Sequence, residues 1–349
     1  MAPWLTSHSY RVNVFGFPNA AGLKDDEQNL GFLDQRAAIE WIKVNIANFG
    51  GDPDRITLWG QSAGAMAVDY YNFAYTEDPI VKGLIMDSGT AQIAGFSVDG
   101  NNHSTFSFIA THFGCGNLTA ESELDCMRQV NHEDISAFLK AQIDGGITFP
   151  LYGFTVENRT IFGNYTERAL VGNFTKLPAI IGTNADEGKS FTLPYDRENG
   201  PDIASANLTT LGLFLCPAVK TTQDRYAADP TVPTYRYLYG GNFTNISPQP
   251  WEGAYHSSEL PLVFGTSDLL RNPNTPFETK VSEQMQDYWL AFMEDPVNAL
   301  PKMGWHPYKP SGDGVLVGWK DVVSQPIEAA RLDAPCDGVV PRDGALPPP

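Results

Sequence analysis

Basic residues are scarce in this chain of 349 residues. It has 23 lysines and arginines against 41 aspartates and glutamates, which gives a formal net charge of -18. A surface with this excess of negative charge repels nucleic acids and anionic membranes, so the composition argues against both as partners. The acidity fits either a cationic ligand or a solvated surface that keeps the protein soluble, and we favour the second interpretation.

Long apolar runs are also lacking. No stretch of the sequence has the pattern of roughly 20 apolar residues that a transmembrane helix needs. Residues 1–17 lack the basic start, apolar run and small-residue cleavage site of a signal peptide. We therefore expect no transmembrane segment and see no leader, although 42% apolar residues are ample for a buried core.

Cysteines number only four, and none lies in a CxxC spacing. This argues against zinc ribbons and thioredoxin-like sites. In an oxidising compartment the four would pair in one of three ways. We expect Cys115 to pair with Cys126, closing a short loop, and Cys216 to pair with Cys336. Four buried free thiols are the alternative.

Sequons for N-linked glycosylation are more frequent than composition alone produces, which indicates the secretory pathway. The eight sequons begin at Asn102, Asn117, Asn158, Asn164, Asn173, Asn207, Asn242 and Asn245. We expect a secreted glycoprotein whose signal peptide was lost together with other upstream sequence.

Strand and helix patterns alternate along the first part of the chain, as is typical of an α/β protein with a mostly parallel sheet. Strands are predicted at residues 10–17, 55–59, 81–86, 178–182 and 234–238, and amphipathic helices at 31–49 and 279–294. Residues 99–173 read as irregular surface insertions. We predict a single domain over residues 1–340 and a disordered tail over 341–349.

The segment GQSAG at residues 60–64 matches the GxSxG nucleophile elbow. In that motif a serine occupies a sharp strand-to-helix turn, and small neighbours such as Gly60 and Gly64 let the backbone approach closely. Ser62 would then project at the carboxyl edge of the sheet. The N–H of Ala63, at the start of the next helix, would donate to an oxyanion.

A serine nucleophile needs a base, and six histidines are available: His8, His103, His112, His132, His256 and His306. The usual order of serine, acid and histidine places the base well downstream and leaves two of them. His256 follows a predicted strand in a polar loop and is favoured. His306 lies between tryptophan and proline, where packing is expected.

The acid should follow a core strand, because its carboxylate must hold the histidine tautomer and stabilise the imidazolium. Asp186 and Glu187 both come directly after the predicted strand at residues 178–182. One could cap the following helical turn while the other faces the histidine. The residues themselves do not choose between the two.

Taken together, these segments resemble the type B carboxylesterases and lipases, the cholinesterase-like family of α/β-hydrolases. The resemblance rests on YRVNVFGFP, on NLGFLDQRAAIEWIKVNIANFGGDPDRITLWGQSAGA, on GLIMDSGT, on PAIIGTNADEG and on HSSELPLVFG, in this order. It implies an α/β-hydrolase fold, a mostly parallel central sheet flanked by helices.

The resemblance also assigns roles. It implies that Glu187 orients His256, and it places Trp305 and Tyr308 in a structural segment, which makes His306 a minor candidate. The two cysteine pairs expected above are similar to those of the family. Gln61 stands where members carry glutamate or glutamine, and glutamine is typical of many secreted fungal lipases and esterases.

One departure from the family is an absence. Its glycine-rich oxyanion loop, an early disulfide and the first strands precede the segment that begins here at Tyr10. In the strand order of that fold, the missing strand that carries the loop lies between the strand expected at residues 10–17 and the one expected at 55–59, so we expect a central gap in the sheet. Losing one oxyanion donor typically costs about a hundred- to a thousandfold in turnover, and the loop supplies two. We therefore expect a truncated chain.

The sequence thus predicts hydrolysis of carboxylic esters, from small molecules or lipids, through an acyl-enzyme on Ser62. His256 would be the base, Glu187 the orienting acid and Ala63 an oxyanion donor, with no metal or organic cofactor. A catalytically silent binding protein of the same fold and an inactive fragment are the alternatives. The particular ester and the oligomeric state stay open.

Overall fold

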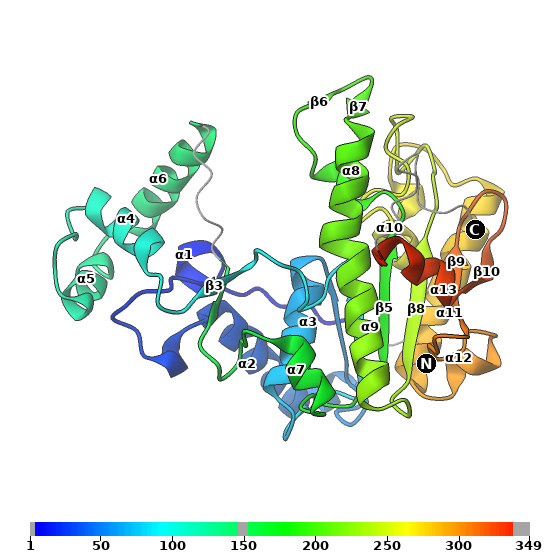
Figure 1. Cartoon of the computed structure of the whole chain (residues 1–349), viewed down its shortest axis with the longest axis horizontal. Coiled ribbons are helices and arrows are strands. Elements are labelled where there is room, and N and C mark those ends of the chain that lie inside the picture. The colour runs from blue at the N-terminus through cyan, green and yellow to red at the C-terminus, as the bar shows by residue number, and fades with distance from the viewer. Residues whose placement is uncertain (1–3, 146–152, 338–349) are drawn as a thin grey trace. The chain divides into compact units, whose positions relative to one another are not determined.

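The computed structural model describes residues 4–145 and 153–337, which form two compact units (Figure 1). Unit 1 comprises residues 46–93 and 164–337 of the described chain, and unit 2 comprises residues 4–45 and 94–163. The single domain over residues 1–340 stays a prediction. The tail predicted over residues 341–349 lies outside the described residues.

A six-stranded sheet forms the centre of unit 1, with the strand order β1-β2-β5-β8-β9-β10. The strands are β1 (Thr57–Gln61), β2 (Gly83–Asp87), β5 (Ala179–Asn184), β8 (Thr234–Tyr239), β9 (Asp313–Val317) and β10 (Ser324–Glu328). All neighbours are parallel except β9 and β10, which are antiparallel. The prediction of a mostly parallel sheet is confirmed. Because these strands are parallel, the carboxyl ends of β1, β2, β5 and β8 meet at one edge.

Four of the predicted strands are present, with ends shifted by a few residues. Residues 55–59, 81–86, 178–182 and 234–238 correspond to β1, β2, β5 and β8. β9 and β10 were not predicted from the sequence. β10 includes Pro326, which is exposed, and a strand tolerates proline only at the edge of a sheet.

The strand predicted at residues 10–17 is wrong. Only a short helix, α1 (Asn13–Gly16), occurs there. Asn13 has a φ of 58°, and its side-chain oxygen accepts a hydrogen bond from the N–H of Val14 at 2.6 Å, so the chain turns instead of extending. The predicted central gap is wrong as well, because β1 ends the series of paired strands among the described residues.

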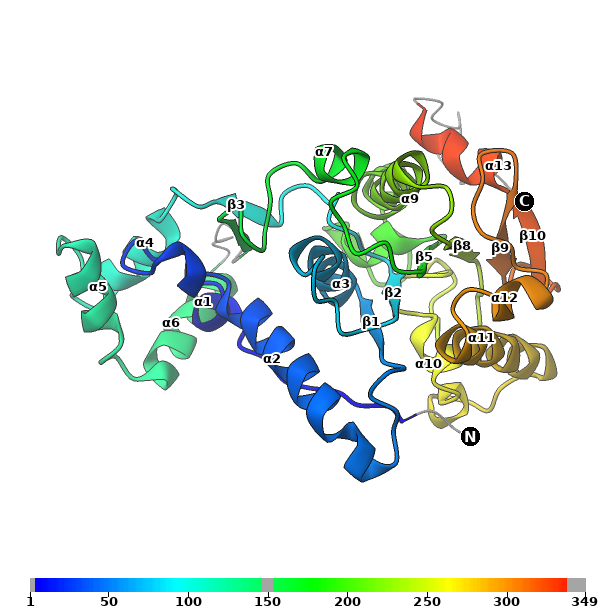
Figure 2. The ribbon, with the colours of Figure 1, turned by 90° about the horizontal axis from the view of Figure 1, so that it is seen from below.

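Helices cover both faces of the sheet in unit 1 (Figure 2). On one face α3 (Ala63–Ala74) packs against β1 and β2, and α9 (Cys216–Ala228) packs against β5 and β8. On the other face lies α11 (Pro276–Glu294), which begins with a capping box between Thr275 and Glu278. The helix predicted at residues 279–294 is confirmed.

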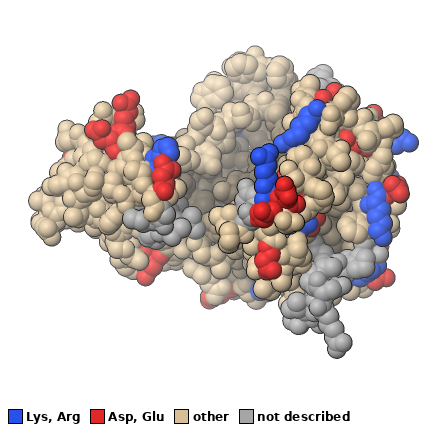
Figure 3. All heavy atoms as spheres, turned by 90° about the horizontal axis from the view of Figure 1, so that it is seen from above, with Lys and Arg blue, Asp and Glu red and all other residues tan. Residues whose placement is uncertain are grey.

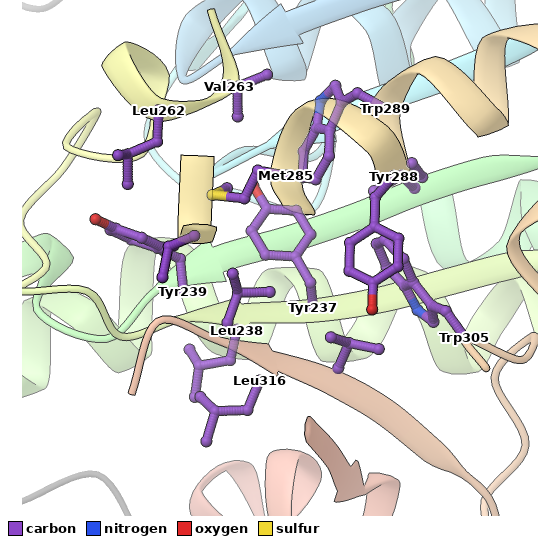
Figure 4. Packing of buried hydrophobic residues seen from close by; sticks show 14 of the residues in the cluster. Tyr237, Leu238, Tyr239, Leu262, Val263, Met285, Tyr288, Trp289, Trp305 and Leu316 are labelled. Carbon is purple, nitrogen blue, oxygen red and sulfur yellow. The ribbon is translucent and has the colours of Figure 1, made fainter. Parts of the chain in front are cut away.

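The core between α11 and the sheet is rich in aromatic residues (Figure 4). Tyr237 and Tyr239 are fully buried on one face of β8, as the two-residue period of a strand requires. Met285 and Trp289 of α11 pack in the same cluster. This packing holds β8 in place, and the chain that follows β8 leads to the carboxyl edge of the sheet.

The remaining elements of unit 1 are short. They are α7 (Tyr165–Leu170), α8 (Ile203–Thr209), α10 (Leu260–Val263), α12 (Ala299–Lys302), α13 (Ala329–Asp333) and a hairpin of β6 (Tyr195–Asp196) and β7 (Gly200–Pro201). Single helical turns occur at Ile46–Phe49, Glu187–Ser190, Ser267–Leu269 and Ala334–Cys336.

A continuous helical segment runs from α8 through a π-helical turn (Thr210–Leu215) into α9. By length and composition alone, this segment, Ile203–Ala228, could cross a membrane, and 39% of its most apolar window is buried. This apolar stretch was not predicted from the sequence. In unit 1, α9 is a core helix with Ala218, Val219 and Thr222 buried.

Unit 2 is mostly helical. Its elements are α1, α2 (Leu30–Asn45), α4 (Ser104–His112), α5 (Ala120–Met127), α6 (His132–Asp144) and the parallel pair β3 (Ser97–Asp99) and β4 (Phe154–Val156), with a turn at Asp25–Glu27. The amphipathic helix predicted at residues 31–49 is present as α2 and the turn that follows it. Asn29, which precedes α2, exchanges two hydrogen bonds with the backbone of Thr155.

The irregular insertion predicted over residues 99–173 is instead helical over much of its length. Thr119 and Asn131 cap the helices α5 and α6 by accepting backbone N–H groups. Apolar side chains of α4, α5 and α6 form a second buried cluster that includes Phe106, Leu124 and Ile135. The frequent polar residues concealed this helical pattern because they lie on the outer faces of short helices.

Both predicted disulfides are confirmed, Cys115 with Cys126 and Cys216 with Cys336. The first lies in unit 2 and joins the end of α4 to α5. The second lies in unit 1 and joins the start of α9 to the turn after α13. The described residues contain no free cysteine.

Seven of the eight sequon asparagines are exposed or partly exposed. Asn245 is the exception, since it is 3% exposed. Its amide nitrogen donates to the backbone oxygen of Ser267 and to the side chain of Asn274, both at 3.1 Å. A glycan replaces one of the two hydrogens on that nitrogen, so it would remove at least one of these bonds, and a buried side chain leaves no room for it. The structure therefore argues against a glycan on Asn245.

The two disulfides should contribute unequally to stability. Cys216–Cys336 closes a loop of 120 residues and Cys115–Cys126 a loop of 11. In the chain-entropy model these loops correspond to about 5 and about 3 kcal/mol respectively. Thermal unfolding of the two double Cys→Ser variants should show the larger loss for the Cys216–Cys336 pair. An equal or reversed order would contradict this account.

Candidate active site

Ser62 occupies a sharp turn between β1 and α3. Its backbone has φ 56° and ψ -121°, a combination that residues other than glycine rarely adopt. The N–H of Ser62 donates to the backbone oxygen of Asp87 at 2.8 Å, and its carbonyl accepts from the N–H of Met66 at 3.0 Å. α3 starts at Ala63, so the serine lies at a helix N-terminus and next to the carboxyl end of β2.

Close backbone approach at this turn depends on two glycines. A Cβ on Gly60 would lie 2.2 Å from the backbone oxygen of Gly64. A Cβ on Gly89 would lie 2.4 Å from the backbone oxygen of Ser62. Gly64 itself has open space around its Cβ position among the described residues. The motif therefore predicts that Gly60 allows close backbone approach. The same role of Gly89, in the loop after β2, was not predicted from the sequence.

Glu187 and His256 form a buried pair at the same edge of the sheet. Glu187 follows β5, His256 lies in the loop between β8 and α10, and the Nδ1 atom of the imidazole is 2.5 Å from Oε2 of the carboxylate. The glutamate side chain is fully buried and that of the histidine is 9% exposed. The N–H of Asn184 donates to the other carboxylate oxygen at 2.7 Å. Because a carboxylate accepts hydrogen bonds, it holds the imidazole in the tautomer with the proton on Nδ1.

Asp186, the other candidate acid, has a different place. It pairs with Lys189 at 2.8 Å and accepts the N–H of Ala254 at 3.0 Å. Asp186 thus anchors the loop that leads to His256 without touching the imidazole, and the structure separates the two acids that the residues alone could not. His306 is exposed between the buried Trp305 and Tyr308.

The second nitrogen of the imidazole contacts Gln61 rather than Ser62. Nε2 of His256 lies 3.1 Å from the side-chain nitrogen of Gln61, and Ser62 makes no hydrogen bond to His256 in the described structure. With the proton on Nδ1, Nε2 is an acceptor, so the Gln61 amide is the donor. The sequence placed Gln61 in the motif but did not predict this contact.

Aromatic rings flank the histidine. The ring centroids of Phe191 and Phe214 lie 4.8 and 4.7 Å from that of His256. Phe214 is buried, whereas Phe191 is 44% exposed. Two apolar walls therefore border the imidazole, and one of them is accessible to solvent.

Two further buried acids lie near Glu187. Burial raises the pKa of Asp87 to about 7, although hydrogen bonds from Trp59 and Tyr237 act in the opposite direction. Burial also raises the pKa of Glu259 well above its usual range, and the charges of Asp87 and Glu187 add to this effect. Glu259 accepts a hydrogen bond from the Asn184 side chain. A protonated Glu259 keeps negative charge from accumulating beside Glu187.

Other kinds of site are not indicated. Within residues 4–145 and 153–337, no three His, Cys, Asp or Glu side chains are placed to hold a metal ion. Acidic and basic side chains are interspersed on the face shown in Figure 3. The chemistry of the region is that of a serine beside a buried acid–imidazole pair.

Comparison with known proteins agrees with this arrangement. Residues 5–207 and 201–333 match the model of the carboxylesterase family. The chain is 48% identical to a "Secreted lipase 5" of Gibberella zeae, over 85% of this chain and 58% of the relative. It is 43% identical to a "Chlorogenic acid esterase" of Aspergillus niger, over 94% of this chain and 65% of the relative. It thus spans less than two thirds of the length of either relative.

The fold is also shared with a solved structure, a thermophilic PNB esterase. The two superpose with a TM-score of 0.74 at 23% sequence identity, over 92% of this chain and 70% of that one. A likeness at this level of identity supports the fold alone. It confirms the predicted fold class.

The strained backbone at Ser62 leads to a stability prediction. Ser62→Gly and Ser62→Ala both remove the hydroxyl, but only glycine relieves the torsional strain, which is typically about 1–3 kcal/mol. Part of this gain is offset because glycine loses more conformational entropy on folding. We expect Ser62→Gly to melt at least about 2 °C above Ser62→Ala. As a control, Ala65→Gly within α3 should lower the melting temperature. A Ser62→Gly variant that is no more stable than Ser62→Ala would contradict the strain.

Proposed function

Because the chain belongs to the carboxylesterase family, we propose that it hydrolyses carboxylic esters with Ser62 as nucleophile, His256 as base and Glu187 as orienting acid. The observation that carries this proposal is the buried 2.5 Å contact between Glu187 and His256 at the sheet edge where Ser62 turns out of β1. If Glu187 only capped the helical turn after β5, its carboxylate would need neither to be buried nor to face an imidazole.

In the acylation step, Nε2 of His256 accepts the Ser62 proton while Oγ bonds to the ester carbonyl carbon. The tetrahedral intermediate places negative charge on the former carbonyl oxygen. The N–H of Ala63, at the first position of the 12-residue helix α3, is a suitable donor to that oxygen. Collapse of the intermediate breaks the bond to the alcohol, which leaves with the proton from His256.

In the deacylation step, His256 takes a proton from water, whose oxygen attacks the acyl carbon. The acid is released and the proton returns to Ser62. Glu187 stabilises the imidazolium in both steps without accepting its proton. These steps require no metal or organic cofactor.

The contact between Gln61 and His256 sets a condition on this mechanism. Nε2 has one lone pair in the neutral imidazole, so it cannot accept from Gln61 and Ser62 at full strength together. The Gln61 amide must therefore move aside when the Ser62 hydroxyl engages the base. The same contact also favours the second candidate, a catalytically silent binding protein in which His256 stays occupied.

The substrate class is a carboxylic ester with apolar character near the reacting carbon. The rings of Phe191 and Phe214 border the base and would exclude water from one side of the bound ester. The relatives named a lipase and a chlorogenic acid esterase represent two classes of ester. Rates across acyl chain lengths, compared with rates on phenolic acid esters, would separate them.

We also propose that the protein is extracellular. Two disulfides and seven accessible sequons fit an oxidising secretory route, and one relative is named a secreted lipase. The excess of acidic residues suits a soluble secreted protein.

Reaction with a fluorophosphonate tests the nucleophile directly. We expect one adduct per chain by intact mass, lost in Ser62→Ala, because the proposed mechanism activates Ser62 and no other serine. His256→Gln and Glu187→Gln should slow the reaction by about a hundredfold or more.

Ser88→Ala is the matched control for this experiment, since Ser88 also has a positive φ after a strand. It should label like the unsubstituted chain. No adduct on the unsubstituted chain, or an adduct that survives in Ser62→Ala, would overturn the proposed function and favour the silent binding protein.

Glycan mapping tests the extracellular proposal. After secretion from a eukaryotic host, endoglycosidase should lower the mass of the protein, and replacing an exposed sequon residue such as Asn173 by glutamine should remove one glycan. Asn245→Gln should leave the glycan mass unchanged because Asn245 is buried. A secreted protein whose mass does not shift would contradict the prediction.

A further inference from the structure

Asp87 ends β2 in the interior of unit 1 and does not take part in the mechanism described above. Its side chain is fully buried. Oδ1 accepts the hydroxyl of Tyr237 at 2.8 Å, and Oδ2 accepts the indole N–H of Trp59 at 2.5 Å. Trp59 lies on β1 and Tyr237 on β8, so one carboxyl group joins three strands of the sheet.

The contact with Tyr237 passes over an intervening strand. β5 lies between β2 and β8, and its residue Gly182 is paired both with Asp87 and with Tyr237. A Cβ on Gly182 would lie 2.0 Å from the ring of Tyr237. Only glycine at this position lets the tyrosine lie across β5 and reach the carboxyl group. The arrangement therefore depends on a residue in each of the four strands.

Asp87 also contacts Ser62, the proposed nucleophile, through its backbone. The carbonyl oxygen of Asp87 accepts the N–H of Ser62 at 2.8 Å. Trp59 lies three residues before Ser62 on β1, and its ring stacks on Phe264 with 4.8 Å between centroids. Both the strand that enters the turn and the turn itself are thereby attached to the end of β2.

We propose that Asp87 is a positioning residue for the nucleophile: its carboxyl group ties Trp59 and Tyr237 to the end of β2 and thereby keeps Ser62 in its strained conformation. The proposal rests on the proposed function in so far as it concerns rate, because it takes Ser62 to be the reacting group. It concerns conformation first, however, and this part is measurable without catalysis.

Asp87→Asn is the informative substitution. It preserves shape, but an amide has one acceptor oxygen and no charge. Its NH₂ group either faces the Trp59 indole, which can only donate, or faces Tyr237, whose hydroxyl must then turn and accept, so one of the two bonds to Asp87 is lost or reversed. We expect amide hydrogen exchange in the segment from Gly60 to Met66 to accelerate about tenfold or more. Exchange in α9 should stay unchanged, because that helix packs on the other face of the sheet from Tyr237 and Trp289.

Fluorophosphonate labelling gives the second readout. If Ser62 is displaced, Asp87→Asn should label about ten- to a hundredfold more slowly than the unsubstituted chain, and kcat should fall while KM stays within about twofold. Tyr237→Phe should slow labelling less. In the Tyr237→Phe background, Asp87→Asn should cost less than it does alone, because the hydrogen bond from the Tyr237 hydroxyl is already absent.

Tyr239→Phe is the matched control. Tyr239 is fully buried on the same face of β8, and its hydroxyl has no hydrogen-bond partner among the described residues. This substitution should leave both readouts within about twofold.

The outcomes separate the two proposals. Unchanged exchange around Ser62 in Asp87→Asn, or equal acceleration in α9, would overturn the positioning role, since the second result means a general loss of stability. If the unsubstituted chain does not label but exchange around Ser62 responds as expected, the proposed function fails and the positioning role stands. If the unsubstituted chain labels and Asp87→Asn labels as fast, the effect on rate is refuted.

Discussion

The backbone of Ser62 is held in a conformation that would relax in an isolated chain, and the carboxyl edge of the sheet is organised around this constraint. A residue at φ 56° and ψ -121° carries strain of about 1–3 kcal/mol, so its surroundings must over-determine it. Parallel pairing of β1 with β2, the hydrogen bond from Ser62 to Asp87 and the immediate start of α3 provide this restraint.

A second constraint is the burial of charge. Three acids, Asp87, Glu187 and Glu259, lie in the interior of unit 1, where negative charges repel one another strongly. The structure separates their roles by their partners. Glu187 faces an imidazole, Asp87 accepts two neutral donors, and burial keeps the proton on Glu259. Only Glu187 has a partner that can become a cation, which is the property an orienting acid needs.

The resting state of the base follows from these contacts. Glu187 sets the tautomer of His256, and the tautomer makes Nε2 an acceptor for whichever donor is nearest. In this structure that donor is Gln61 and not Ser62. The motif GQSAG therefore supplies both the proposed nucleophile and a competitor for its base. Catalysis would require exchange between the two, and the aromatic walls of Phe191 and Phe214 leave the imidazole little other freedom.

Local sequence determined those features that depend on neighbouring residues. The turn at Ser62 was predictable because GxSxG combines small residues with a preceding strand, and the core strands were predictable from their apolar runs. Four cysteines allow three pairings, and the observed pairing was favoured by the short loop between Cys115 and Cys126 and by the family resemblance. The strand predicted at residues 10–17 was wrong because the left-handed backbone of Asn13 overrides the strand-like composition of this segment. Helices α4 to α6 were not predicted because short amphipathic helices have weak sequence patterns. Tertiary structure alone decided three other features. It decided that Glu187 rather than Asp186 faces His256, that Gln61 contacts Nε2 of His256, and that Asp87 joins three strands. Each depends on which strand ends lie side by side, and this adjacency arises from long-range pairing that no local pattern contains.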